Sequence, residues 1–247
     1  MVCTLPLALT FLTKFPWFRA PQADAGALAR SMFWFPWVGA LLGVSFWGAW
    51  AGLPRILPAP AAAGVLLCFT VWITGGLHLD GLADTVDGLG GGQTPTERLR
   101  IMKDSRVGTF GVLALVLVLV LKFSFFLSLA GKGGAAAGLI LYPVVSRWGM
   151  VLLAYLSPYA RPEGGLGQAM TLGVSARTLA GATASAAALA AAAFGVRGLI
   201  LLAAAGLAVW LGSLYCRKQL GGVTGDVLGA ADEALEVLVL GGSLLLG

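Results

Sequence analysis

Three aspartates lie close together in a chain that is otherwise strongly apolar. Asp80, Asp84 and Asp87 stand at positions i, i+4 and i+7, and in a helix this spacing places them within an arc of about 60°. Three carboxylates on one face repel one another and are costly beside apolar sequence unless a cation offsets them. Oxygen ligands of this kind favour Mg²⁺, Mn²⁺ or Ca²⁺. The spacing therefore predicts a metal site, with a solvated polar loop as the simpler alternative.

A second charged cluster follows at residues 103–106, which read Lys-Asp-Ser-Arg. Before it, residues 94–97 read Thr-Pro-Thr-Glu, a capping-box pattern with proline at the first helical position. We expect a helix to start there and to return the second cluster towards the aspartates. Asp104 would then be a fourth carboxylate around a metal pair, while Lys103 and Arg106 would offer positive charge to a phosphate. The alternative for Arg106 is a membrane anchor.

Other polar residues stand in or beside apolar segments. His78 would point roughly opposite the aspartates in a continuous helix, so a structural or hydrogen-bonding role competes with a catalytic one. Arg147 lies inside an apolar stretch and is predicted to face a polar cavity or a carboxylate, with snorkelling as the alternative. Asp226, Glu233 and Glu236 form a carboxylate stripe at the start of the last apolar segment. This stripe is either a macrodipole effect or a second wall of the same cavity.

The chain as a whole is too apolar for a soluble domain. It is 58% apolar and 11% charged, with a mean hydropathy of +0.90, whereas soluble domains carry about 25% charged residues. Apolar stretches of spanning length recur, which predicts an all-α, polytopic membrane protein with one domain over residues 1–247. The net charge of +5 comes from Lys and Arg residues spread singly between these stretches. That spread favours orientation in a membrane and argues against nucleic-acid binding.

An interfacial N-terminal segment, residues 4–18, and about seven spanning helices would position the polar residues. The predicted spans are residues 31–53, 60–77, 107–130, 135–156, 178–195, 198–215 and 227–247. In this layout eleven of the sixteen Lys and Arg residues lie on the side of the N-terminus, three lie on the other side, and Lys122 and Arg147 lie inside spans. All eleven acidic residues fall on the N-terminal side. The positive-inside rule makes that side cytoplasmic and places the C-terminus outside.

Several motifs, taken together, are specific for one family. Residues 75–88 read GGLHLDGLADTVDG and residues 101–111 read IMKDSRVGTFG. Further matches lie at residues 11–16 (FLTKFP) and 221–230 (GGVTGDVLGA), so the likeness runs through nearly the whole chain. These motifs closely resemble the cobalamin synthase family, the adenosylcobinamide-GDP ribazoletransferases. Lys14 stands where arginine is more usual, a difference that keeps the charge.

The resemblance implies a Mg²⁺-dependent transferase in the cytoplasmic (inner) membrane of a bacterium or archaeon, with its active site on the cytoplasmic face. It would join adenosylcobinamide-GDP to α-ribazole or α-ribazole 5′-phosphate and release GMP. Small residues on the helix surfaces permit a homodimer. The expected metal ligands are Asp80, Asp84, Asp87 and Asp104. The expected catalytic residues are Asp87, Asp104 and Arg106, with either aspartate as the general base. The expected substrate-binding residues are Lys14, His78, Lys103, Ser105, Arg147, Arg161, Thr224 and Asp226.

Two other classes of function stay open. A cation- or proton-coupled transporter would also keep carboxylates among membrane helices, but the carboxylates gather at one face and no inverted repeat is visible. A CDP-alcohol-type phosphotransferase acting on lipid would likewise hold metal with aspartates. The residue pattern departs from those enzymes, because Asp84 stands near the position where they carry arginine.

Overall fold

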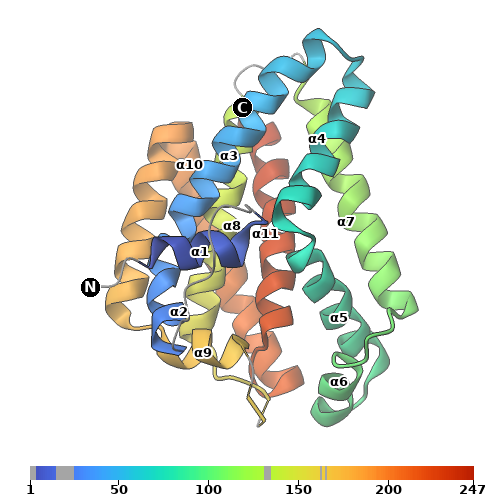
Figure 1. Cartoon of the computed structure of the whole chain (residues 1–247), viewed down its shortest axis with the longest axis vertical. Coiled ribbons are helices and arrows are strands. Elements are labelled where there is room, and N and C mark those ends of the chain that lie inside the picture. The colour runs from blue at the N-terminus through green and yellow to red at the C-terminus, as the bar shows by residue number, and fades with distance from the viewer. Residues whose placement is uncertain (1–3, 15–24, 131–134, 162, 165) are drawn as a thin grey trace.

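The computed structural model describes residues 4–14, 25–130, 135–161, 163–164 and 166–247, and these residues fold as helices without a strand. The all-α prediction is therefore confirmed. Figure 1 shows the long helices running side by side along the longest axis, with the short helix α1 lying across them. The α-helices are α1 (Leu5–Leu12), α2 (Ala25–Ser31), α3 (Phe35–Gly52), α4 (Ala59–Thr74), α5 (Leu77–Gly91), α6 (Pro95–Ile101), α7 (Thr109–Ser128), α8 (Gly138–Leu156), α9 (Leu166–Gly173), α10 (Ala176–Leu220) and α11 (Gly225–Leu246). Three short 3-10 turns, η1 (Met32–Trp34), η2 (Leu53–Arg55) and η3 (Ala135–Ala137), complete the described elements.

Helix α8 is the centre of the bundle. It packs against α3, α10 and α11, and side chains such as Leu139 and Val151 are completely buried. Helix α3 approaches it through a glycine, because a Cβ atom on Gly39 would lie 2.3 Å from the carbonyl oxygen of Pro143. Close backbone approach of this kind lets helices in a membrane gain packing energy without a hydrophobic driving force.

Helix α10 is two helices joined at Gly195. This glycine has a non-helical conformation with φ 61° and ψ −144°, a region that other residues avoid. In a continuous helix, residues 190 and 198 would be about 12 Å apart along the axis. A Cβ atom on Gly198 would instead lie 2.2 Å from the carbonyl oxygen of Ala190, so the chain folds back on itself. The two halves correspond to the predicted segments 178–195 and 198–215.

The predicted spans are all largely helical, but the count of seven crossings is not confirmed. Four stretches of the described chain are long and apolar enough to cross a membrane, namely Gly26–Arg55, Thr109–Ser128, Gly138–Leu156 and Ala176–Leu220. The number rises to five if α4 and α5 are taken as one bent span. Several apolar helices of this length indicate a membrane protein.

Helices α4 and α5 meet at a sharp break, where the chain turns by 88°. The break lies at Gly75 and Gly76, which have φ values of 69° and 71°. Glycine reaches this left-handed region without steric cost. Because α5 leaves the line of α4 and carries three aspartates, we treat it as the beginning of the polar segment and not as part of a span.

Two short helices fix the ends of this polar segment. The backbone N–H of Lys14, just after α1, donates to the carbonyl of Ile73 at 2.7 Å and so ties the N-terminal helix to the end of α4. The predicted interfacial segment, residues 4–18, is described only to residue 14. At the other end, α6 begins with the predicted capping box, in which Thr94 and Glu97 bond each other's backbone N–H groups at 3.3 and 3.2 Å. That prediction is confirmed.

Candidate active site

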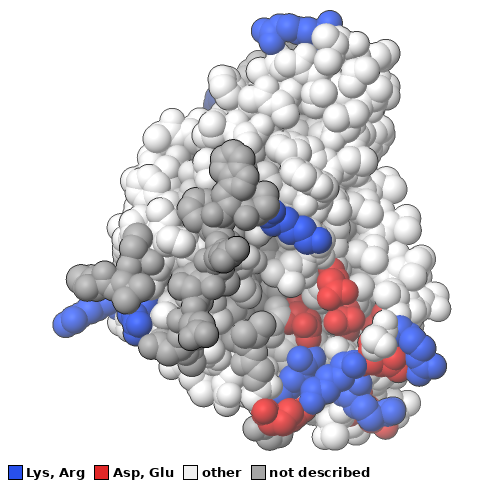
Figure 2. All heavy atoms as spheres, viewed as in Figure 1, with Lys and Arg blue, Asp and Glu red and all other residues white. Residues whose placement is uncertain are grey.

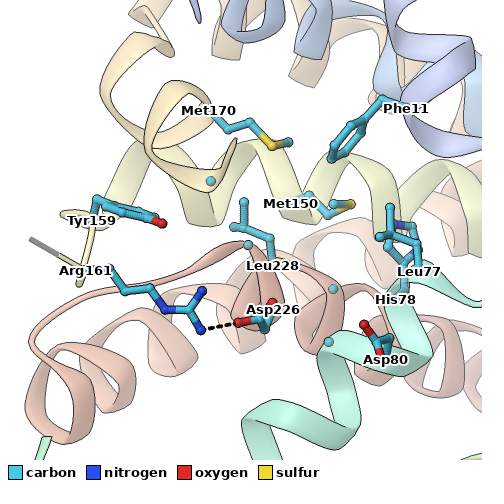
Figure 3. A pocket seen from close by; sticks show the side chains of 14 residues that line it. Phe11, Leu77, His78, Asp80, Met150, Tyr159, Arg161, Met170, Asp226 and Leu228 are labelled. Atoms are coloured by element: carbon cyan, nitrogen blue, oxygen red, sulfur yellow. Dashed lines mark hydrogen bonds and ion pairs between the residues drawn. The ribbon is translucent and has the colours of Figure 1, made fainter. Parts of the chain in front are cut away.

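A cavity of about 220 Å³ lies where α5 crosses the start of α11, beside α8 and α9. We call it the carboxylate cavity. Figure 3 shows its lining side chains. Its apolar side chains are Phe11, Leu77, Met150, Met170 and Leu228, and its polar side chains are His78, Asp80, Tyr159, Arg161 and Asp226. An apolar wall thus faces a wall of charged and hydrogen-bonding groups.

Two glycines let α5 and α11 cross closely enough to close this cavity. A Cβ atom on Gly81 would lie 2.7 Å from the carbonyl oxygen of Asp226, and one on Gly229 would lie 3.2 Å from the Cα atom of His78. A side chain at Gly81 would therefore push the two helices apart. This close crossing brings Asp80 of α5 and Asp226 of α11 to one cavity, although they are far apart in the sequence.

The acidic side of the cavity carries more negative than positive charge. The pKa of the Asp84 carboxyl is raised from 3.8 to about 6, because it is partly buried and lies near the carboxylates of Asp226 and Asp80, while Arg161 acts in the opposite direction. The guanidinium of Arg161 lies 2.7 Å from the Asp226 carboxylate. The cavity wall thus holds two carboxylates, those of Asp80 and Asp226, and one guanidinium, with the Asp84 carboxyl nearby. This excess of negative charge suits a bound cation.

Arg161 reaches the cavity because its loop is held against the start of α11. The backbone N–H of Ala160 donates to Val223 at 2.9 Å, and that of Val223 donates to Pro158 at the same distance. The Thr224 hydroxyl caps α11, accepting from the Val227 N–H at 3.3 Å, and bonds Asp226 at 3.2 Å. Arg161, Thr224 and Asp226, all predicted to bind substrate, are thus brought together.

Asp87 has a different neighbourhood from Asp80 and Asp84. Its two carboxylate oxygens accept the N–H groups of Gly108 at 2.7 Å and Gly111 at 2.8 Å, so it caps the start of α7. Asp87 meets different neighbours from Asp80 because the seven residues between them advance the helix by about 10 Å. The geometry gives Asp87 an anchoring role at the start of α7, and its predicted roles as metal ligand and base stay predictions.

Asp104 pairs with Arg106 in an exposed groove. The Arg106 side chain donates to both Asp104 oxygens, from Nε at 3.1 Å and from Nη2 at 2.8 Å. These hydrogen bonds lower the pKa of the Asp104 carboxyl to about 2. The groove is also lined by Asp87, Arg100 and Lys103, and Lys103 pairs with Glu163. Asp104 thus lines a different depression from Asp80, which corrects the expected single cluster of four carboxylates.

The predicted metal ligands do not form a finished cage. Within the described ranges, no group of three His, Cys, Asp or Glu side chains is arranged closely enough to hold a metal ion. Ser105 is exposed in the loop of the groove, and Lys14 is exposed beside the α4–α5 break. A Cβ atom on Gly75 would lie 2.2 Å from the Cε atom of Lys14, so this lysine crosses the break closely.

A second charged region lies inside the bundle, and we call it the buried ionic cluster. Its members are Lys122 of α7, Arg147 of α8, and Asp232, Glu233 and Glu236 of α11. The Lys122 amino group lies 2.5 Å from Glu233 and 2.6 Å from Glu236. Arg147 lies 3.0 Å from Asp232 and also pairs with Glu236. Each of these side chains is buried.

The cluster confirms one prediction and corrects another. Arg147 faces carboxylate partners, as expected of an arginine inside an apolar stretch. The predicted stripe on the last segment is divided, because Asp226 lines the carboxylate cavity while Glu233 and Glu236 are buried within the bundle. Sequence reasoning missed Lys122 as their partner. The signal was available, since a lysine in the middle of the apolar stretch 107–130 needs a carboxylate.

His78 connects the two regions. Its Nδ1 atom lies 2.7 Å from the Asp232 carboxylate of the cluster, while the same side chain lines the carboxylate cavity (Figure 3). The two groups are in contact, and the hydrogen-bonding or substrate-binding role expected of His78 stays a prediction. Figure 2 shows that most acidic and basic side chains visible on this face gather at one end, around α5 and α6, with few charges over the rest of the surface. The cavity lies towards this polar end.

Comparisons with known proteins identify the family. The family model described as cobalamin-5-phosphate synthase matches residues 4–244. A curated relative from Syntrophobacter fumaroxidans, named adenosylcobinamide-GDP ribazoletransferase, is 44% identical over 238 residues, covering 94% of both chains. Relatives with the same name from Desulforamulus reducens and Pseudomonas paraeruginosa are 41% and 43% identical, covering 97% and 96% of this chain and 95% and 96% of their own. No solved structure matches. The chain belongs to the cobalamin-5-phosphate synthase family.

Proposed function

We propose that this chain is an adenosylcobinamide-GDP ribazoletransferase of the cytoplasmic membrane. It would join adenosylcobinamide-GDP to α-ribazole, or to its 5′-phosphate, and release GMP. The observation that carries the proposal is the carboxylate cavity, where Asp80, Asp226 and Arg161 face an apolar wall. This pairing suits a diphosphate on the polar side and an aromatic base on the apolar side.

Arg161 is the residue best placed to bind a phosphate. Its guanidinium already has one carboxylate partner, but its Nε atom is buried with no hydrogen-bond partner among the described residues. A buried N–H group without a partner is costly, and a phosphate oxygen would satisfy it. We therefore assign Arg161 to the diphosphate, where it would hold the group in place for in-line displacement.

The apolar side chains would exclude water from the reaction. Phe11, Met150 and Met170 come from three different helices and close one side of the cavity. A cavity of about 220 Å³ is smaller than the 300–1,000 Å³ of common ligand sites, so the corrinoid would remain outside it. Only the diphosphate and the ribazole end would enter, and the hydroxyl would attack the phosphorus on the cobinamide side.

Mg²⁺ is the cation that we propose for the acidic side. Asp80 and Asp84, with Asp226 beside them, fit this ion because carboxylate oxygens are its preferred ligands. Their negative charges are only partly offset by Arg161, and the charges of Asp226 and Asp80 contribute, after burial, to the raised pKa of Asp84. Asp87 and Asp104 fit less well, since both already accept strong hydrogen bonds. When bound, Mg²⁺ would neutralise the diphosphate and the leaving phosphate of GMP.

The same charges support a cytoplasmic orientation of the site. Most of the charged side chains visible in Figure 2 gather at one end of the molecule, around α5 and α6, and the predicted positive-inside bias assigns this end to the cytoplasm. Nucleotide-linked substrates are made there. Labelling of single cysteines in intact cells at positions 93 and 56, both exposed, would test the orientation, with only the first protected from an impermeant reagent.

The test of the function is GMP release by the purified protein in nanodiscs. We expect GMP to appear only when adenosylcobinamide-GDP, α-ribazole and Mg²⁺ are all present. Release that does not require α-ribazole would indicate a hydrolase, and no release with all three would contradict the proposal. Mass spectrometry of the product distinguishes ribazole transfer from transfer to a lipid.

A further inference from the structure

The apolar wall of the carboxylate cavity is built from helices that are distant in the sequence. Phe11 comes from α1, Met150 from α8, Met170 from α9 and Leu228 from α11. Figure 3 shows the two thioether side chains and the Phe11 ring pointing into the same space. Met150 is 2% exposed, and Met170 and Leu228 are each 1% exposed. A group that contacts this wall is therefore shielded from bulk water.

Two polar groups of the cavity lining are already engaged. The Tyr159 hydroxyl donates to the Gly164 carbonyl at 3.2 Å, and the Gly167 carbonyl accepts the Thr171 hydroxyl at 2.7 Å. The four side chains of the apolar wall contain only carbon and thioether sulfur, and such sulfur is a weak acceptor. A hydroxyl or amino group pressed against these side chains would find no strong acceptor among them.

Such a wall distinguishes substituents by their polarity more than by their size. A methyl group on an aromatic ring gains free energy when it leaves water, and methionine sulfur makes favourable contacts with aromatic rings. A hydroxyl group of nearly the same size loses its hydrogen bonds to water and gains none in return. The base cannot turn round to avoid this loss, because the reacting end of the same substrate has to lie beside the diphosphate on the polar side of the cavity.

We propose that Phe11, Met150 and Met170 select the base of the ribazole substrate by excluding polar substituents. This inference rests on the proposed function and specifies the class of base that the cavity accepts. The base of α-ribazole is a benzimidazole with two methyl groups, which this wall can bury without leaving a donor unpaired. A benzimidazole with a hydroxyl group, or a purine with an amino group, carries such a donor at its outer edge. The three residues determine specificity and take no part in the bond changes.

Matched substrates test this selection in the wild-type protein. An α-ribazole analogue in which a hydroxyl group replaces one methyl group differs little from α-ribazole in size. GMP release is measured in nanodiscs with saturating adenosylcobinamide-GDP and Mg²⁺. We expect kcat/KM for the hydroxyl analogue to be about 10- to 100-fold lower than for α-ribazole, because a buried hydroxyl without a partner is penalised by that amount.

Met170→Gln should weaken the selection, because glutamine has nearly the length of methionine and its amide oxygen can accept a hydrogen bond from the hydroxyl group. We expect the ratio of the two kcat/KM values to fall below about 3. Met170→Leu is the matched control, since it changes the shape of the side chain without adding an acceptor, and it should keep the ratio of the wild type. Met32→Gln places the same amide at a fully buried position outside the cavity lining and should also keep the ratio.

The ratio compares two substrates on the same protein, so it does not depend on how much of each variant folds. Equal use of both substrates by the wild type would overturn the proposal. A ratio that Met170→Gln leaves unchanged, or that Met170→Leu lowers as strongly, would also overturn it. If the wild type released no GMP with α-ribazole itself, the proposed function would fail instead.

Discussion

The carboxylate cavity and the buried ionic cluster use the same side-chain types but differ in how completely their carboxylates are paired. In the cavity wall, Arg161 is paired with Asp226, while Asp80 in the same wall and Asp84 nearby have no such ion pair among the described residues. In the cluster, Lys122 and Arg147 are in direct contact with every carboxylate. The first arrangement leaves negative charge and partly open space, which suits ligand binding, whereas the second is closed and holds helices together. A charge in a membrane protein therefore has to be interpreted from its partners as well as from its depth.

Removal of divalent cations should give the largest difference between the two regions, because only the carboxylate cavity should depend on a bound cation. We expect a chelator to reduce GMP release to background, because excess carboxylate charge would repel the diphosphate. Thermal unfolding without substrate should change little, because the buried ionic cluster supplies its own cations. Added Mg²⁺ should restore the rate, and full activity in the chelator would show that the cavity works without metal.

Substitution of Lys122 by methionine should have the largest effect on stability. It leaves Glu233 and Glu236 buried with too little positive charge, and breaking a buried pair in this way costs about 3–5 kcal/mol. The free energy of unfolding in detergent measures the loss, with Lys103→Met in the exposed groove as the control. A stable Lys122→Met protein would mean that the cluster is open to water.

Asp84→Asn should have the opposite effect to Lys122→Met, with a loss of activity and no loss of stability. We expect GMP release to fall about 100-fold, because the site loses a carboxylate, with no loss of thermal stability. The half-maximal Mg²⁺ concentration for activity should rise in parallel. If the variant lost stability and its Mg²⁺ dependence did not change, Asp84 would have a structural role and not a ligand-binding one.

Asp87→Asn tests the carboxylate that belongs to neither region. The amide keeps one acceptor for two backbone N–H groups at the start of α7, so we expect a loss of about 1–3 kcal/mol in the free energy of unfolding. The rate at saturating Mg²⁺ should follow the folded fraction. A large fall in the rate of GMP release by fully folded protein would show that Asp87 takes part in catalysis.

The smallest effect is expected from Thr94→Ala, which removes the cap of α6 outside both regions. Loss of a helix cap costs about 1 kcal/mol, and the kinetic constants should be nearly unchanged. Circular dichroism and GMP release together check this. An equally small effect from Asp84→Asn would remove the contrast between the two regions.

The positions of the helices and the polar residues that matter could be predicted from the sequence, because hydropathy and helix caps depend on residues close together in the chain. The capping box at Thr94 and the carboxylate partner of Arg147 were predicted in this way. The neighbours of Asp87 and the partner of Lys122 were not, because they depend on which helices cross and at what height. The spacing of the aspartates gave their common face, but a helix face can meet two different neighbours along its length.

The anchoring of α7 by Asp87 has a consequence for the lipid. Helix α7 is 20 residues long, which corresponds to about 30 Å, the hydrocarbon thickness of a bilayer. Many of its side chains, including Leu113 and Leu117, are exposed on the outside of the bundle. A thinner bilayer would tilt such a helix, and the two hydrogen bonds to Asp87 would transmit that tilt to α5 and its aspartates. The positions of the aspartates in the active site would thus depend on the thickness of the bilayer.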